Sequence, residues 1–200
     1  MGVDDKRNTI MVVRGEAILP YLNAIAALRI SVFREWPYLY DGSEAYEAKY
    51  LHSYVYEPNS CVVLVQHKQK LIGASTALPL TAADPAFSQP FKSLGIDPAE
   101  VFYFGESVLL SEWRGQGIGK AFFAERLKAA REYGSRIAAF CAVERQENHP
   151  LRPIDYRPLD AFWQSMGFEP EAGLKAKFSW REVPSGKESE NTLQFWLKPQ

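Results

Sequence analysis

A glycine-rich turn is the feature of this sequence that points most directly to chemistry. Residues 114–119 read Arg-Gly-Gln-Gly-Ile-Gly, follow the apolar run 108–110 and lead directly into a helix-forming stretch. Glycine is a poor start for a helix because it costs backbone entropy and helix propensity. The amide groups at a helix N-terminus lack intrahelical partners and carry the positive end of the helix dipole. A turn without side chains therefore predicts a binding site for a phosphate or diphosphate.

The spacing of this turn excludes two common phosphate-binding loops. A Walker A loop places four residues between its first glycine and a Gly-Lys pair, and Ser or Thr follows. Here only three residues separate Gly115 from Gly119, and Ala121 follows Lys120. The dinucleotide fingerprint G-x-G-x-x-G needs a glycine where Lys120 stands. Arg114 and Lys120 bracket the turn and are placed to add charged contacts to phosphate oxygens.

The hydrophobic pattern around the turn predicts a mixture of strands and helices, which is typical of a layered α/β architecture. The stretch 81–100, with three prolines, is expected to be a long loop with at most one helical turn. Strands are expected at 9–14, 61–67, 70–80, 101–110, 136–143, 174–183 and 192–198, and helices at 17–34, 44–56, 117–133 and 158–166.

The pattern Arg114-x-x-Gly117-x-Gly119, between a strand and a helix, resembles the signature Q/R-x-x-G-x-G/A of the GNAT superfamily of acyl-CoA-dependent N-acyltransferases. The segment 159–171, LDAFWQSMGFEPE, is similar to the FYxxxGF helix–turn–strand of that family. The expected element order also matches along nearly the whole chain. The resemblance implies one domain over residues 1–200, with a mixed, mostly antiparallel sheet of about seven strands, about four flanking helices, and strands four and five splayed apart.

The resemblance also implies a co-substrate, acetyl-CoA. In the family the glycine turn binds the pyrophosphate and the fourth strand binds pantetheine, whereas a purely structural alternative is that the glycines only permit a tight strand-to-helix turn. The cofactor-binding residues carried over are Val108, Leu109 and Leu110 on the strand, Arg114, Gly115, Gln116, Gly117, Ile118, Gly119 and Lys120 in the turn, and Trp163 in the last helix.

Acyl transfer to an amine needs a neutral amine and a proton for the departing thiolate. Glu106 is the candidate base, because it lies two residues before Val108 and so on the same strand face. The alternative is a carboxylate paired with a nearby Arg or Tyr. The acid of the family is a Tyr, but Trp163 stands there and an indole gives up no proton. Tyr156, seven residues earlier, is the substitute if the helix begins early enough, and otherwise solvent protonates the thiolate.

The acceptor side is expected in the aromatic stretch after the first helix, by analogy with the family. Its residues Trp36, Tyr38 and Tyr40 are candidate substrate contacts, and Glu35 and Asp41 are placed to attract a cationic amine. An aromatic stripe at helical spacing follows in the next helix, and it is either core packing or a wall for the amine: Tyr46, Tyr50 and Tyr54.

Bulk composition limits the partners. A net charge of −1 gives no basic field for nucleic acid or anionic membrane, the polar N-terminus carries no signal peptide, and no apolar run approaches a membrane span. Three scattered histidines and two cysteines make no metal-ligand pattern. Cys61 and Cys141 are expected to be buried thiols, Cys141 being the rival for a covalent acyl carrier. A cytoplasmic location is expected, and the resemblance admits a homodimer without predicting one.

Together these features predict an N-acetyltransferase that moves an acetyl group from acetyl-CoA to a primary amine, on a small molecule or a peptide, by direct attack in a ternary complex. The alternative, motivated by Trp163, is an acyl-CoA-binding or sensing module of the same fold without transferase activity.

Overall fold

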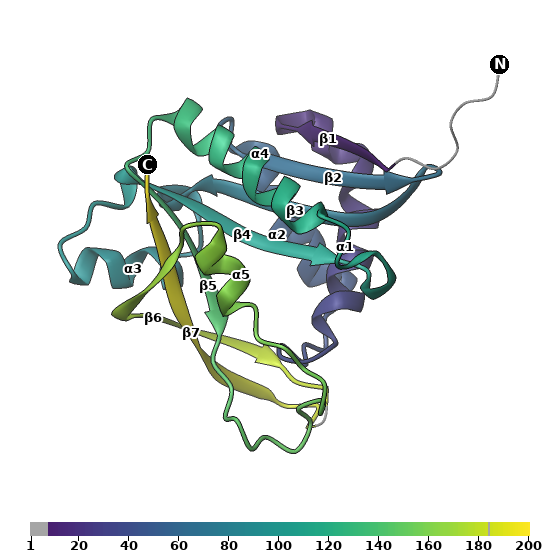
Figure 1. The fold of residues 1–200 in the computed structure, drawn as a ribbon. Coiled ribbons are helices and arrows are strands. Elements are labelled where there is room, and N and C mark those ends of the chain that lie inside the picture. Colours follow the sequence, from purple (N-terminus) through teal and green to yellow (C-terminus); the bar gives the residue numbers. More distant parts are fainter. Residues whose placement is uncertain (1–7, 184) are drawn as a thin grey trace.

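The structure, a computed structural model, describes residues 8–183 and 185–200. Its centre is a seven-stranded sheet in the order β1-β2-β3-β4-β5-β7-β6 (Figure 1). Every neighbouring pair is antiparallel except β4 and β5, which are parallel, so the predicted mixed and mostly antiparallel sheet is confirmed. The strands are β1 Thr9–Val13, β2 Cys61–His67, β3 Lys70–Pro79, β4 Val101–Leu109, β5 Ile137–Val143, β6 Glu169–Arg181 and β7 Glu188–Pro199.

Helices cover both faces of the sheet (Figure 1). On one face lie α1 Leu22–Phe33, α2 Glu44–Tyr56 and α3 Pro85–Ser93, and on the other lie α4 Ile118–Tyr133 and α5 Asp160–Ser165. The buried apolar side chains accordingly form one cluster between α4 and the sheet, a second between α1, α2 and the sheet, and a third under α3. The described chain thus has five α-helices, where the sequence led us to expect about four.

The additional helix is α3, which occupies the stretch that was expected to be a loop. Asp84 caps it by accepting a hydrogen bond from the Ala86 amide at 2.8 Å, and Pro85 occupies its first turn, where proline needs no hydrogen-bond partner. Phe87 and Phe91, one turn apart, are buried against the sheet. Pro85 therefore opens this helix, and Pro90 lies within it without ending it.

The first helical segment is longer and more apolar than the sequence analysis allowed. A short 3-10 helix, Gly15–Tyr21, runs into α1, and the 19 residues Gly15–Phe33 meet the length and composition of a membrane span. The expectation that no apolar run approaches that length is wrong. In the structure Ile18 and Ile25 are fully buried in the cluster with α2 and the sheet, so this segment forms part of the core.

The parallel pair β4–β5 is joined only at its beginning. The register pairs Val101 with Ile137 and ends at Tyr103 with Ala139, although β4 continues to Leu109 and β5 to Val143. The predicted splay between the fourth and fifth strands is therefore confirmed.

A bulge in β4 marks the point where the two strands separate. Ser75 faces Ser107 and Ala77 faces Phe104, so Gly105 and Glu106 together oppose the single residue Thr76. The Glu106 amide donates to the Thr76 hydroxyl at 3.3 Å. A bulge bends its strand and increases the local twist, and this bend directs the second half of β4 away from β5.

Gly105 leaves no room for a side chain in this bulge. A Cβ there would collide with the Tyr54 hydroxyl and lie 2.7 Å from Thr76 Oγ1. We expect Gly105→Ala to lower the free energy of unfolding by about 2 kcal/mol, because the rigid, buried Tyr54 ring cannot move aside. Urea denaturation measures the loss. The double variant Gly105→Ala/Tyr54→Phe should recover part of it, and an unchanged single variant would contradict this account of the bulge.

Candidate active site

The glycine turn presents unpaired main-chain amides at the start of α4. Gly115 and Gly117 have φ angles of 76° and 84°, in the left-handed region that favours glycine, and no side chain caps the helix. Within the described part of the chain, the N–H groups of residues 115–120 donate no hydrogen bond to protein. A Cβ on Gly115 or Gly117 would meet no atom within 4 Å. Open space in front of unpaired amides fits a phosphate group.

Gly119 has a different role from the other two glycines. Its φ is not positive, and a Cβ there would lie 3.3 Å from the ring of Phe162 on α5. This glycine lets α5 pack closely against the start of α4. The structural alternative weighed for the glycines therefore applies to Gly119.

The polar side chains of the turn differ in what they contact. Arg114 forms an ion pair of 2.9 Å with Glu35, and its Nε donates to the Leu109 carbonyl at 3.2 Å. Glu35 therefore holds Arg114 in place of the cationic amine that was expected for it. The side chains of Arg114 and Glu35 are both about half exposed, and ion pairs this exposed contribute little to stability. The guanidinium group of Arg114 can therefore exchange Glu35 for a phosphate. Gln116 bonds the Glu112 carbonyl, and Lys120 is exposed.

The main chain of β4 offers fewer free groups than the sequence analysis assumed. The Leu110 amide donates to Ile72 on β3 at 3.0 Å, and the Leu110 carbonyl accepts from Trp113 at 3.0 Å. Because the two edges of an antiparallel strand alternate, Val108 also faces β3, whereas Ser107 and Leu109 face the gap toward β5. Of the three predicted pantetheine contacts only Leu109 keeps a suitable orientation, and Ser107 was missed because the sequence does not set the strand register.

Trp163 and Tyr156 do not share a helix face. Trp163 lies half-buried on α5, with its ring 5.1 Å from Phe140 and 5.0 Å from Trp196. Since α5 begins only at Asp160, Tyr156 lies in the loop before the helix, so the condition under which it would share the face of Trp163 is not met. Burial, and after it the charge of Asp160, raises the pKa of Tyr156. The late start of α5 has a physical reason: the proline-rich loop before it disfavours helical backbone and so delays the helix.

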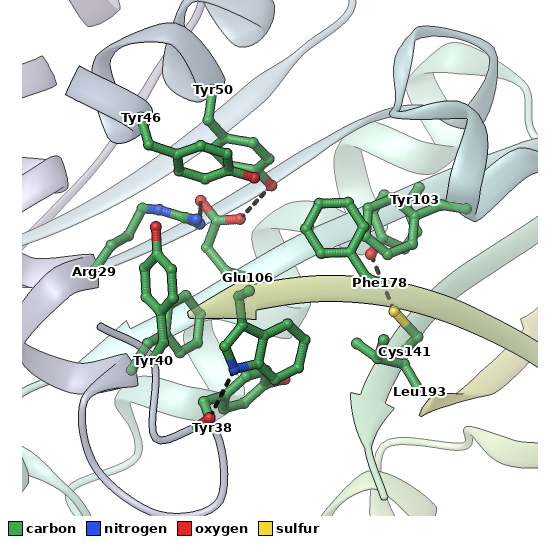
Figure 2. Close-up of a pocket in the computed structure, with 14 residues that line it drawn as sticks. Arg29, Tyr38, Tyr40, Tyr46, Tyr50, Tyr103, Glu106, Cys141, Phe178 and Leu193 are labelled. Carbon is green, nitrogen blue, oxygen red and sulfur yellow. Dashed lines mark hydrogen bonds and ion pairs between the residues drawn. The ribbon is translucent and has the colours of Figure 1, made fainter. Parts of the chain in front are cut away.

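A pocket opens where β4 and β5 separate, on the face covered by α1 and α2 (Figure 2). Its volume is about 100 Å³. Most of its wall is aromatic, consisting of Phe33, Tyr38, Tyr40, Tyr46, Tyr50, Phe87, Tyr103, Phe178 and Trp180. Arg29, Gly105, Glu106, Cys141 and Leu193 complete the lining.

The predicted acceptor residues divide between this pocket and its surroundings. Tyr38 and Tyr40 line the pocket as expected, but Trp36 packs outside it, 4.9 Å from His149. Of the tyrosine stripe on α2, Tyr46 and Tyr50 belong to the wall and Tyr54 is fully buried in the core, so both interpretations of the stripe hold in part. Asp41 instead pairs with Arg34 and Arg181.

Arg29 is the centre of a buried network of charges. It forms an ion pair with Glu47 and, at 2.7 Å, a second ion pair with Glu106. Figure 2 shows Arg29 beside Glu106. The Tyr40 hydroxyl donates to Glu47 and the Tyr50 hydroxyl to Glu106, each at 2.9 Å. Burial alone would lower the pKa of Arg29, but the charges of Glu106 and its other neighbours outweigh burial and raise it, so the guanidinium stays protonated. Glu106 is thus a paired carboxylate, which was the alternative to its role as a free base.

The sequence contained a signal for Arg29 that the sequence analysis did not use. Arg29 lies four residues after Ile25, on the apolar stripe that faces the core. A cation on such a stripe needs a buried carboxylate partner. Glu47 carried no comparable signal, because a carboxylate in the first turn of a helix is common on exposed surfaces.

The other polar groups of the pocket are neutral. Burial raises the pKa of Cys141 to about 12, and its sulfur lies 3.2 Å from the Tyr103 hydroxyl. Burial likewise raises the pKa of Tyr50 and Tyr103. Both cysteines are buried and free, as predicted. A thiol held in its protonated form does not suit Cys141 for covalent acyl transfer.

A second buried cation, Arg126, approaches the bulge from the opposite face of the sheet. It is 2% exposed, donates from Nη1 to the Glu106 carbonyl at 3.2 Å and lies 4.5 Å from the centre of the Phe104 ring. Burial lowers the pKa of Arg126 to about 10, so it remains charged at neutral pH. Arg126 therefore fastens α4 to the bulge.

Comparisons with known proteins agree with this geometry. The fold and the unpaired turn define a class of α/β proteins with a partly separated sheet and an anion-binding turn at the start of a helix. A family model described as the acetyltransferase (GNAT) family matches residues 25–168, well over half of the chain. The chain therefore belongs to the GNAT acetyltransferase family. No curated protein sequence matches it.

Solved structures match nearly the whole chain at low sequence identity. An N-acetyltransferase from Staphylococcus aureus Mu50 has a TM-score of 0.61 at 11% identity, covering 96% of this chain and 98% of that one. The ribosomal-protein-alanine N-acetyltransferase from Brucella melitensis has a TM-score of 0.61 at 17% sequence identity, and the match covers 95% of this chain and 99% of that one. The structure of yncA from Salmonella typhimurium, solved with its cofactor acetyl-CoA, has a TM-score of 0.58 at 12% sequence identity. The match covers 95% of this chain and 93% of that one. At these identities the likeness establishes the fold.

Removing Arg29 should destabilise the protein strongly. We expect Arg29→Met to lower the free energy of unfolding by about 3–5 kcal/mol, because it leaves two buried carboxylates without a cation. Arg34→Met is the matched control at the end of the same helix. Its exposed pair with Asp41 should contribute at most about 1 kcal/mol. Equal losses in urea denaturation of the two variants would contradict a buried network.

The two cysteines should resist alkylation. Because burial raises the pKa of Cys61 to about 11 and of Cys141 to about 12, both remain thiols at pH 8. We expect iodoacetamide to leave both unmodified in the folded protein during the time that consumes free glutathione, as measured by intact mass. Unfolding in urea should expose both. Rapid alkylation of native Cys141 would restore it as a candidate acyl carrier.

Proposed function

We propose that this protein transfers an acetyl group from acetyl-CoA to a primary amine. The observation that carries the proposal is the presence of three features around one point of the sheet: unpaired amides at the start of α4, the separation of β4 from β5, and a pocket that contains Glu106. The α4 helix lies on one face of the sheet, and the helices α1 and α2, which contribute to the pocket lining, lie on the other (Figure 1). Two reactants that enter from the two faces would therefore meet at the bulge.

The residues of the turn fit the diphosphate of coenzyme A. The amides of Gly117 and Ile118 would bind its oxygens, and Lys120 and Arg114 would add charge. The main chain of Ser107 and Leu109, which faces the gap, would bond the pantetheine arm. Acetyl-CoA supplies the acetyl thioester, and every other group in the site belongs to the protein.

In the pocket, Glu106 is the only carboxylate among the lining residues. We assign it the proton that the ammonium group must lose before the nitrogen can attack. As the new C–N bond forms and the C–S bond breaks, the nitrogen loses a second proton to solvent. Solvent also protonates the thiolate, because Trp163 donates no proton and Tyr156 lies outside the pocket. Direct attack is consistent with Cys141 being a protonated thiol.

A binding module without activity remains the alternative, favoured by Trp163 and by the pairing of Glu106 with Arg29. Thiol release from acetyl-CoA with a panel of primary amines separates the two. We expect amine-dependent release of coenzyme A, and about a 100-fold lower kcat/KM in Glu106→Gln, which keeps the shape of the side chain without its charge. Tight binding of acetyl-CoA with no release for any amine would contradict the transferase.

A pair of variants isolates the electrostatics of the turn. Gly117→Asn and Gly117→Asp differ by one charge, and both residues tolerate a left-handed backbone better than other side chains do. We expect the Asp variant to bind coenzyme A about tenfold more weakly than the Asn variant, because its carboxylate repels the diphosphate. Calorimetry at low ionic strength measures both. Equal Kd values would contradict anion binding at this turn.

A further inference from the structure

The charges around the aromatic pocket are unbalanced. Arg29 lies between Glu47 and Glu106, so two buried carboxylates share one guanidinium group. Arg126 is a second buried cation, but it reaches the Glu106 main chain from the other face of the sheet and does not line the pocket. The buried tyrosines and Cys141 of the lining are neutral. A negative potential in a buried site favours a cationic ligand.

The pocket offers a carboxylate for a cationic ligand, whereas its one cation is already paired with carboxylates. Glu106 Oε1 is buried and lies 2.7 Å from Arg29, yet no hydrogen bond of suitable geometry reaches it. An ammonium group can supply that hydrogen bond. Arg29, the only cation in the lining, is already shared by two carboxylates. A ligand carboxylate would therefore enter without a free cation to balance its charge, which is costly in a buried site.

The walls favour one flat, apolar group. The rings of Tyr46 and Tyr50 lie 6.4 Å apart and within 12° of parallel, and Phe178 lines the pocket at the other side of Glu106 (Figure 2). The volume of about 100 Å³ is of the same order as the ~150 Å³ apolar cavity that accepts benzene. One ring or a short apolar arm fits this space, whereas a polyamine would bring a second cation for which the lining has no partner.

We propose that the amine acceptor is a compact aromatic monoamine, in which one aromatic ring and one ammonium group are joined by a short linker and no carboxylate is present. The proposal rests on the proposed function for the position of the thioester, but it concerns the pocket alone. The ammonium group binds Glu106 and the ring packs among Tyr46, Tyr50 and Phe178.

The test uses 2-phenylethylamine and three relatives that each change one feature. Phenylalanine adds a carboxylate, 2-phenylethanol removes the cation, and spermidine replaces the ring by a second and third cation. Calorimetry, without and with saturating coenzyme A, is expected to show that 2-phenylethylamine binds at least about tenfold more tightly than each of the others. Equal or tighter binding of phenylalanine or spermidine would overturn the proposal, as would no binding of 2-phenylethylamine in either condition.

Two tyrosines on α2 provide a matched pair of variants. Tyr46 lines the pocket and is 42% exposed, whereas Tyr56 is 79% exposed and lies outside it. Tyr46→Leu should weaken 2-phenylethylamine binding by about fivefold without changing the Kd of coenzyme A, because an aromatic contact to the ring of the ligand is lost. Tyr56→Leu should change neither the Kd of 2-phenylethylamine nor that of coenzyme A. The same Kd for 2-phenylethylamine in both variants would show that the amine does not bind at this wall.

Thiol release measured beside binding separates this proposal from the transferase proposal. Binding of 2-phenylethylamine without its acetylation supports the aromatic pocket and contradicts the transferase. Acetylation of a peptide N-terminus or a polyamine, with no binding or acetylation of 2-phenylethylamine, supports the transferase and overturns the aromatic pocket.

Discussion

The arrangement of this site depends on the bulge at Gly105 and Glu106, which is held from both faces of the sheet. Arg126 on α4 bonds the main-chain carbonyl of Glu106, and Arg29 on α1 pairs with its carboxylate. The bulge bends β4 away from β5, so the gap between them and the pocket beneath it exist only while this residue stays in place. One residue therefore connects the helix that begins at the glycine turn with the helix that lines the acceptor pocket.

The protein has a buried network of ion pairs at a place where well-packed apolar side chains can be equally stable. A buried ion pair loses much of its attraction to desolvation, and well-packed apolar side chains often replace it without loss. Arg29, with Glu47 and Glu106, is thus better explained by what it does to the pocket than by stability. The network fixes a carboxylate beside the strand gap and leaves one of its oxygens without a hydrogen bond. An aromatic wall around that carboxylate excludes water and strengthens its attraction for a cation.

The order of elements and the glycine turn could be anticipated, because hydrophobic periodicity and a local motif encode them. The splay of β4 from β5 could be anticipated only because the resemblance to the family implies it. Features that depend on tertiary contacts could not be anticipated from the sequence. The register that turns Leu110 toward Ile72 is set by pairing with β3, and the helix start that leaves Tyr156 outside α5 is set by the loop before Asp160. α3 was missed because its prolines suggested a loop, although one of them opens the helix. The partners of Arg29 come from distant segments that no local pattern relates.

The most direct test of this account is an NMR titration that follows the backbone amide signals with coenzyme A. The unpaired N–H groups at the start of α4 should move most, so the largest proton shifts are expected at Gly117, Ile118 and Gly119, with smaller shifts at Ser107 and Leu109 along the gap. The amide of Leu110, bonded to β3, should change little. Saturable binding of coenzyme A that leaves the signals of residues 115–120 unmoved would contradict the account.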